Sequence, residues 1–280
     1  MYLALALLSS LVLGSADFVG GAAARRARAA VVVVWSNAAG LLAALVLVVL
    51  AVPGAASLRD LGWGAAAGIS GSFGAVLLYR ALACGVMSVV APSSAAAAAA
   101  APVSVGIALG ERISGPAAVG VVAALGSLVL LTHTSGSGER NRRPVARSMA
   151  YAVLAGISFG IFLVLLAQTS TASSLWPLVA ARFASLGLLV ALALVRRQRL
   201  DLAGPSARLA LLAGMLDMAS NVLFLVAVRG GQLVLVGLLA SLSPLGTVGL
   251  ARLVLRERIR AVQGLGAALA MGSVLLLALA

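Results

Sequence analysis

The amino-acid sequence predicts an all-α polytopic membrane protein with ten transmembrane helices, arranged as two inverted five-helix repeats. Three observations carry this prediction. Hydrophobic residues make up 62% of the 280 positions and charged residues 10%, whereas a soluble domain has about 25% charged residues. The apolar runs between Arg, Pro and Gly residues reach the length of about 20 residues that a bilayer-spanning helix needs. A twenty-residue motif recurs 146 positions further along the chain.

The recurring motif is ERISGPAAVGVVAALGSLVL at residues 111–130 and ERIRAVQGLGAALAMGSVLL at 257–276, with identity at eight of the twenty positions. The same offset pairs Gly14 with Gly160. A chain rich in Ala, Leu and Gly would match by chance at roughly one position in ten. The sequence is therefore interpreted as a duplication, with one structural unit in each half.

The apolar runs divide the chain into two repeats joined by a polar linker. The first repeat is expected at 1–134, the linker, with its SGSGERNRRP stretch, at 135–148, and the second repeat at 149–280. Short polar connections separate the runs elsewhere. The expected spans, in order, are 2–22, 30–51, 61–82, 86–109, 114–132, 149–168, 175–195, 208–228, 232–252 and 260–279.

Five spans are an odd number, so the second repeat must enter the membrane from the opposite side. Inverted repeats are a common architecture of secondary transporters, with the substrate site where the halves meet. With this topology sixteen of the twenty arginines share one side; Arg59, Arg112 and Arg229 lie on the other, and Arg182 lies inside a span. The arginine-rich side is expected to be cytoplasmic. We expect a multi-pass protein of a bacterial plasma or inner membrane.

Several motifs resemble one transporter family. The segment Ala240–Leu277 combines a Pro-containing helix, a Leu-x-Glu-Arg turn and a Gly-rich helix, and residues 109–131 form the corresponding element of the first half. Residues 79–92 and 227–244 resemble the opening of the fourth helix of each repeat. In these motifs the chain resembles the EamA-type branch of the drug/metabolite transporter superfamily. The resemblance implies ten helices around a central cavity and transport of small metabolites, often export.

Ionisable residues within a span are costly and usually face a cavity. Asp217 lies near the middle of the expected span 208–228, and Asn221, four residues later, shares its helix face. Asp217 is a candidate for binding a proton or a cation. Arg182 is its expected partner across the helix bundle, and a purely structural Asp217–Arg182 pair is the alternative interpretation.

Three further polar residues are candidates for the cavity wall. Asp17 lies toward the end of the first span, where it faces either the cavity or the membrane interface. Asn37 and Tyr79 lie in the second and third spans. With Asp217, Asn221 and Arg182 they form the predicted set of substrate- and ion-binding residues.

Prolines inside spans indicate kinks or hinges. Pro92 and Pro102 fall in the fourth span and Pro244 in the ninth, which are equivalent spans of the two repeats. Each proline removes a backbone donor, and the freed carbonyl must face protein or water. Two interpretations of these prolines are kept: a static kink, and a hinge that opens one end of the cavity.

The Glu-Arg pairs of the repeated motif have a structural interpretation. Glu111 and Arg112, like Glu257 and Arg258, come just before an apolar helix. The glutamates could satisfy backbone N–H groups and the positive end of that helix. We interpret these four residues as part of a packing framework.

The residue types present argue against an enzyme and against metal or cofactor binding. No Ser/His/Asp set, pair of neighbouring carboxylates or phosphate-binding Gly loop is recognisable. Cys84 is the single cysteine, which excludes a multi-cysteine metal site. The net charge of +13 is explained by membrane topology and does not imply nucleic acid.

The function favoured by the sequence is secondary active transport of small metabolites, amino acids or related compounds, in the export direction and by alternating access. The expected partners are a small-molecule substrate, the lipid bilayer and a coupling proton, in a monomer or homodimer. One alternative is proton-coupled efflux of lipophilic cations or drugs. An alternative from another class is a lipid-handling or scaffold membrane protein.

Overall fold

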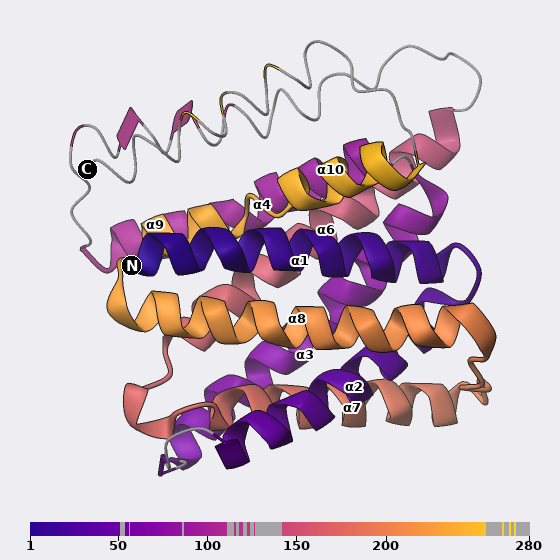
Figure 1. Cartoon of the computed structure of the whole chain (residues 1–280), viewed down its shortest axis with the longest axis horizontal. Coiled ribbons are helices and arrows are strands. Elements are labelled where there is room, and N and C mark those ends of the chain that lie inside the picture. Colours follow the sequence, from indigo (N-terminus) through magenta and orange to yellow (C-terminus); the bar gives the residue numbers. More distant parts are fainter. Residues whose placement is uncertain are drawn as a thin grey trace.

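The computed structural model describes residues 1–50, 54–55, 57–85, 87–110 and 142–255, with single positions between 115 and 126 and between 265 and 272. Throughout these ranges the regular structure is helical, without strands (Figure 1). In chain order the elements are α1 (Tyr2–Ala24), α2 (Ala29–Leu50), α3 (Leu58–Cys84), α4 (Met87–Ala108), α6 (Arg142–Ala167), the 3₁₀ helix η1 (Thr171–Ser173), α7 (Trp176–Val195), α8 (Gly204–Gly230), α9 (Leu233–Ala240) and α10 (Pro244–Leu255).

Six described helices are long and apolar enough to cross a membrane: α1, α2, α3, α7, α8 and residues 147–167 of α6. Most helix limits agree with the expected spans to within a few residues. Three helices, α3, α6 and α8, begin three or more residues earlier than predicted, and a polar cap or an early proline accounts for each, with Pro205 at the start of α8. The Ser57 hydroxyl accepts the Asp60 N–H at 3.1 Å and caps α3. α6 begins at Arg142, inside the expected linker, with Pro144 in its first turn, where proline costs no hydrogen bond.

The expected span 232–252 is not one helix, and this prediction was wrong. α9 ends at Ala240, a turn covers residues 241–243, and α10 begins at Pro244. Pro244 has no N–H to continue the helix. The Leu242 N–H instead donates to the Leu239 carbonyl at 3.1 Å and the Leu245 N–H to the Leu242 carbonyl at 3.0 Å, so that three-residue bonds of the turn kind replace the four-residue bonds of the helix.

Two expected elements lie almost wholly outside the described residues. These are the spans 114–132 and 260–279, of which only single positions are described. The four residues of the Glu-Arg pairs, Glu111, Arg112, Glu257 and Arg258, also lie outside the described part of the chain. Their interpretation as a packing framework stays a prediction.

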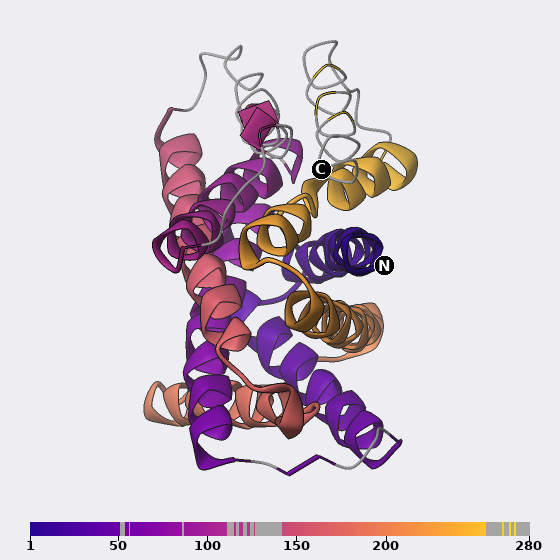
Figure 2. The ribbon, with the colours of Figure 1, turned by 90° about the vertical axis from the view of Figure 1, so that its left-hand side faces the viewer.

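The two halves of the chain pack chiefly on each other. α1 packs on α8 and α3 packs on α6, and the 146-residue offset relates these two contacts, since it carries α1 onto α6 and α3 onto α8. The contacts of α3 with α7 and of α2 with α8 are related in the same way. Figure 1 and Figure 2 both show α1 lying along α8.

Glycine contacts repeat this relation at the level of single residues. A Cβ on Gly68 of α3 would lie 2.0 Å from the carbonyl oxygen of Ala181, and a Cβ on Gly214 of α8 would lie 2.0 Å from that of Ser36. Gly68 and Gly214 are 146 positions apart. Both residues therefore let two backbones approach more closely than any side chain would permit, as is typical of helix packing in lipid.

A second pair of glycines behaves alike. A Cβ on Gly14 would lie 2.8 Å from the Thr247 nitrogen, and one on Gly160 would lie 2.8 Å from the Ala101 Cβ. The two glycines are 146 positions apart, and so are the two residues that they face. The repeat in the sequence thus corresponds to a repeat in the contacts between the halves.

The substitution Gly68→Ala is expected to lower the free energy of unfolding by about 1–3 kcal/mol, because the methyl group forces α3 away from α7. Thermal unfolding in detergent measures the loss. Gly62→Ala is the matched control in the same helix, since nothing lies within 4 Å of its Cβ position. The control should be neutral or stabilising, because alanine favours helix. Equal losses in both variants would contradict this account of the packing.

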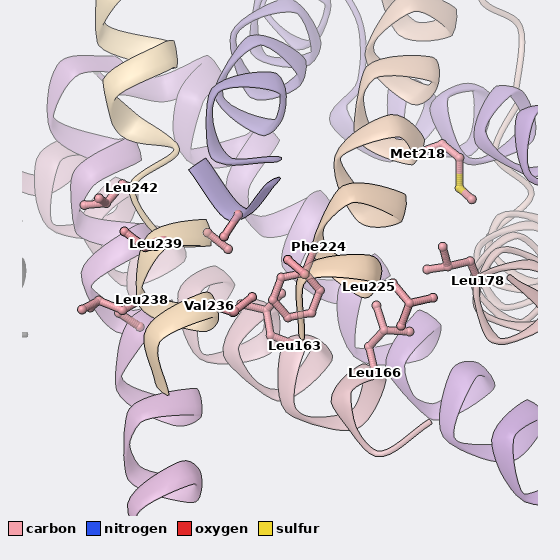
Figure 3. Close-up of a cluster of buried hydrophobic side chains, with 14 of the residues drawn as sticks. Leu163, Leu166, Leu178, Met218, Phe224, Leu225, Val236, Leu238, Leu239 and Leu242 are labelled. Atoms are coloured by element: carbon pink, nitrogen blue, oxygen red, sulfur yellow. The ribbon is translucent and has the colours of Figure 1, made fainter. Parts of the chain in front are cut away.

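Buried apolar side chains gather in two clusters at opposite ends of the bundle. The first lies where α6 and α8 end and α7 and α9 begin, and contains Leu166, Leu178, Phe224 and Leu238 (Figure 3). The second lies where α1, α3 and the connection between α7 and α8 meet α2, and contains Val32, Leu78 and Leu82. We call the end of the bundle with the first cluster the Asp60 end, because Asp60 in the first turn of α3 lies there. We call the end with the second cluster the Arg26 end, after Arg26 in the connection between α1 and α2.

Candidate functional site

A cavity lies between the two apolar clusters. Its walls come from α1, α2, α3, α4, α6, α7 and α8 and from the turn between α9 and α10. All six predicted binding residues line it: Asp17, Asn37, Tyr79, Arg182, Asp217 and Asn221. Much of the remaining wall is apolar, with Phe159, Phe162, Leu163, Leu178 and Phe224. The polar residues that the sequence singled out are thus gathered around one space.

Arg182 is the centre of the polar network. Its guanidinium forms a salt bridge with the Asp217 carboxylate, as predicted, and this is the only ion pair within the described ranges. A second guanidinium nitrogen donates to the Asn37 Oδ1 at 3.1 Å. The Arg182 side chain is 13% exposed and that of Asp217 26%. Both groups therefore keep contact with the cavity while remaining paired.

The amides on either side orient this ion pair. The Asn221 Nδ2 donates to the backbone carbonyl of Asp217 at 2.9 Å and to its carboxylate at 3.3 Å, which confirms that the two share a helix face. The Asn37 Oδ1 also accepts from the Ser185 hydroxyl at 2.9 Å, while its Nδ2 donates to the Val33 carbonyl at 2.9 Å. The network joins α2 of the first half to α7 and α8 of the second.

Asp17 faces the same cavity but is left without a partner. No hydrogen bond or ion pair engages its carboxylate within the described part of the chain. Tyr79 is buried, and its hydroxyl lies against Gly20, where a Cβ would be 2.1 Å away. The cavity therefore holds one compensated carboxylate, Asp217, and one uncompensated carboxylate, Asp17. Of the two positions considered for Asp17, the cavity is the one observed.

Serines form a polar lining that the sequence prediction did not include. Ser9 of α1 and Ser220 of α8 are buried and hydrogen-bonded to each other. Each hydroxyl donates to the backbone carbonyl of the other residue at 2.9 Å. Ser36 and Ser220 directly precede Asn37 and Asn221. The position of a serine directly before each of these asparagines was the feature of the sequence that could have indicated the serine lining. The serines that line the cavity are Ser9, Ser36, Ser72, Ser94, Ser185, Ser220, Ser241 and Ser243.

The three prolines occupy different positions around this site. Pro92 and Pro102 lie within the continuous helix α4, and Pro102 packs against Gly237 of α9, where a Cβ would lie 2.6 Å from its Cβ. Pro244 begins α10, directly after the cavity-lining turn. The break in the helix lies at the cavity, and its use as a hinge stays a prediction.

A second polar cluster closes the Asp60 end. Asp60 is 3% exposed, and its carboxylate accepts from the hydroxyls of Ser170 and Ser173 at 2.5 Å each and from the Ser170 N–H at 3.2 Å. Arg229 of α8 donates to the Ser170 carbonyl at 2.7 Å. The connection between α6 and α7 is therefore held between the start of α3 and the end of α8. The sequence prediction missed Asp60.

The substitution Asp60→Asn should loosen this end, because the amide replaces an acceptor of three hydrogen bonds to a charged group, each worth about 1.5–3 kcal/mol. We expect a lower melting temperature in detergent. We also expect faster labelling of a cysteine at cavity position 72, introduced with Cys84→Ser, by an impermeant maleimide added from the Asp60 side. Asp201→Asn, on an exposed carboxylate, is the control. Unchanged labelling would show that the cluster does not restrict access.

Comparisons with known proteins concern the family of the second half of the chain and the fold of the whole. The family model described as "EamA-like transporter family" matches residues 146–279. No curated protein matches the chain. A solved structure described only as "Crystal structure of protein" has 17% sequence identity and a TM-score of 0.72, over 98% of this chain and 96% of that one. At this identity the likeness concerns the fold. The family match confirms, for the second half of the chain, the resemblance predicted from the sequence: residues 146–279 match an EamA-like transporter unit, and the chain is a multi-pass membrane protein.

Proposed function

We propose that this chain is a secondary active transporter that exports small zwitterionic metabolites, amino acids or close relatives, by alternating access. We further propose that it is built from ten spans in two inverted five-helix repeats. The observation that carries the proposal is one cavity between the halves that holds an ion pair, Arg182–Asp217, beside an unpaired carboxylate, Asp17. The contacts that recur at the 146-residue offset support the repeat architecture.

The charges of the cavity suit a zwitterion. The Asp17 carboxylate would receive the amino group, because nothing else in the described residues neutralises it. Arg182 would receive the carboxylate, since guanidinium binds carboxylate with paired hydrogen bonds. The apolar wall from Phe159, Phe162 and Phe224 would accommodate an apolar side chain, which points to apolar amino acids within the class.

Proton coupling follows from competition for Asp17. The carboxylate has no ion-pair partner within the described residues, so it can hold either a proton or the amino group of the substrate. A proton that binds from one side therefore displaces the substrate, and a substrate that binds from the other side displaces the proton. This negative linkage between the two ligands is what export in exchange for protons requires.

Alternating access would use the two ends of the bundle. The Asp60 cluster and the neighbouring apolar cluster close one end, with contacts that join both halves. The turn at residues 241–243 interrupts the helix beside the cavity. Discontinuous helices at the substrate site are characteristic of transporters that rock one unit against another. Pro244 would serve as the hinge.

The decisive experiment is a flux screen in proteoliposomes with an imposed pH gradient. The proposal expects gradient-driven movement of at least one apolar amino acid and no movement in protein-free vesicles. Labelled phospholipids and a cationic dye are tested in parallel. Phospholipid movement alone would indicate a lipid-handling protein. Absence of flux for every class would favour the scaffold interpretation and overturn the proposal.

A second candidate is efflux of lipophilic cations. Its supporting observation is the combination of unpaired Asp17 with Phe159, Phe162 and Phe224 around one cavity. Aromatic faces attract cations, by about 0.5–2 kcal/mol each. This function does not need Arg182 to bind substrate. Dye efflux that survives replacement of Arg182 would favour it over amino-acid export.

A further inference from the structure

Arginines from two distant connections meet in a pocket at the Arg26 end of the bundle. Arg26 and Arg28 come from the connection between α1 and α2, and Arg197 and Arg199 from the connection between α7 and α8. The two connections contain six arginines, of which these four line the pocket and Arg25 and Arg196 do not. A general preference for arginine on one side of the membrane explains their number but not their convergence.

The pocket is shaped by specific contacts. The Trp35 Nε1 of α2 donates to the Leu200 carbonyl at 2.8 Å and fixes the second connection against the first half. Arg197 adopts a φ of +48°, a conformation uncommon for residues other than glycine. The Gln198 N–H then turns back to the Ala193 carbonyl at 2.8 Å. The connection between α7 and α8 is therefore held in a defined conformation that brings its arginines to the pocket.

The four guanidinium groups have no anionic partner among the residues that the structure describes. Across the described residues the only salt bridge is Arg182–Asp217, in the central cavity. Asp201 lines the arginine pocket but is not within ion-pair distance of any arginine. Four like charges gathered around one space repel one another unless a mobile or bound anion compensates them. The arrangement is complementary to a ligand that carries negative charge.

We propose that this pocket binds the phosphate of an anionic phospholipid headgroup. Guanidinium pairs with phosphate through two parallel hydrogen bonds, which makes arginine the preferred partner of this group. The pocket lies where spans end, at the level of the headgroups, and basic pockets at this level recognise anionic lipids. Leu194 and Val195, on the last turn of α7, are 70% and 82% exposed and would lie along the acyl chains. A free phosphate would use the arginines but not these apolar residues.

A lipid in this pocket would connect the two halves of the chain. One arginine pair belongs to the first half and the other to the second. A bound phosphodiester therefore stabilises the arrangement in which the two connections are close together, and it leaves the central cavity free. The composition of the surrounding membrane would in this way influence the equilibrium between conformations.

The test compares two double variants of the full chain, purified in a neutral detergent. Arg26→Gln with Arg199→Gln removes one pocket arginine from each connection. Arg25→Gln with Arg196→Gln removes the same charge from the same connections outside the pocket. Native mass spectrometry with dioleoylphosphatidylglycerol, and with dioleoylphosphatidylcholine as the neutral probe, gives the affinities. We expect phosphatidylglycerol to bind more tightly, with affinity falling on the order of thirtyfold in the pocket variant and less than about threefold in the control.

Each other outcome overturns a stated part of the proposal. Equal losses in the two double variants would assign the effect to general surface charge. Equal binding of the two lipids would exclude recognition of an anionic headgroup. Protection against thermal unfolding by inorganic phosphate as strong as that by phosphatidylglycerol would identify a free anion as the ligand. If the pocket variant does not purify as a monodisperse species, the single variant Arg199→Gln is measured against Arg196→Gln.

Discussion

Replacing Arg182 with glutamine is expected to lower transport efficiency roughly 10- to 100-fold at equal protein levels. Arg182 makes the only described ion pair and a hydrogen bond to Asn37, and charge-assisted hydrogen bonds contribute about 1.5–3 kcal/mol each. Asp217→Asn should produce a loss of similar size. The initial rate of gradient-driven uptake of a labelled apolar amino acid into proteoliposomes measures both variants.

The reciprocal exchange separates a transport role from a structural one. Arg182→Asp combined with Asp217→Arg retains an ion pair between α7 and α8, and we expect it to recover part of the thermal stability lost in the single variants. We expect transport to remain lost, because the positive charge is now displaced from the position that meets the substrate carboxylate. Recovery of both stability and transport would assign the pair a purely structural role.

The residues of the central network could be predicted because charge within an apolar run is conspicuous in a single sequence. Asp217 and Arg182 stand out as ionisable groups inside spans, where their cost implies a partner or a cavity. The four-residue spacing of Asp217 and Asn221 fixes them to one helix face. These inferences need only the helical period and the energetics of the membrane, and the contacts observed agree with them.

Asp60 could not be predicted in the same way. It lies in the first turn of α3, where an acidic residue is common at a helix start. Its burial depends on Ser170 and Ser173, which lie 110 and 113 positions along the chain. Nothing in the local sequence indicates that pairing. The arginine pocket could not be predicted for the same reason, because it depends on where two connections that are distant in the sequence meet.

The interruption between α9 and α10 could be predicted only in part. Pro244 signals an interruption, and the sequence prediction treated it as a kink or a hinge within one span. A kink leaves the chain helical, whereas the structure has a turn before α10. The new geometry is held by contacts with α1, since the Thr247 hydroxyl donates to the Gly14 carbonyl at 2.9 Å. Packing across the two halves therefore decides how far the helix opens, and that is not encoded locally.

Asp17→Asn is expected to abolish uptake driven by a pH gradient while exchange of labelled for unlabelled substrate continues at a reduced rate. The carboxylate is uncompensated within the described residues, so it can hold either a proton or the substrate amino group. An amide does neither, because it is uncharged and does not take up a proton. Exchange requires only that the loaded protein changes conformation, and this step does not need the proton. Gradient-driven uptake therefore distinguishes coupling from binding.

The matched control for Asp17→Asn is Glu139→Gln, which removes a carboxylate from the polar stretch SGSGERNRRP between the two repeats and should leave both activities unchanged. A variant that lost gradient-driven uptake and exchange together would place Asp17 in substrate binding alone, leaving Asp217 as the proton acceptor. Gradient-driven uptake that persists in Asp17→Asn would remove Asp17 from the coupling mechanism. Since Arg182 compensates Asp217 and nothing described compensates Asp17, the electrostatics favour Asp17 as the group whose charge must alternate during transport.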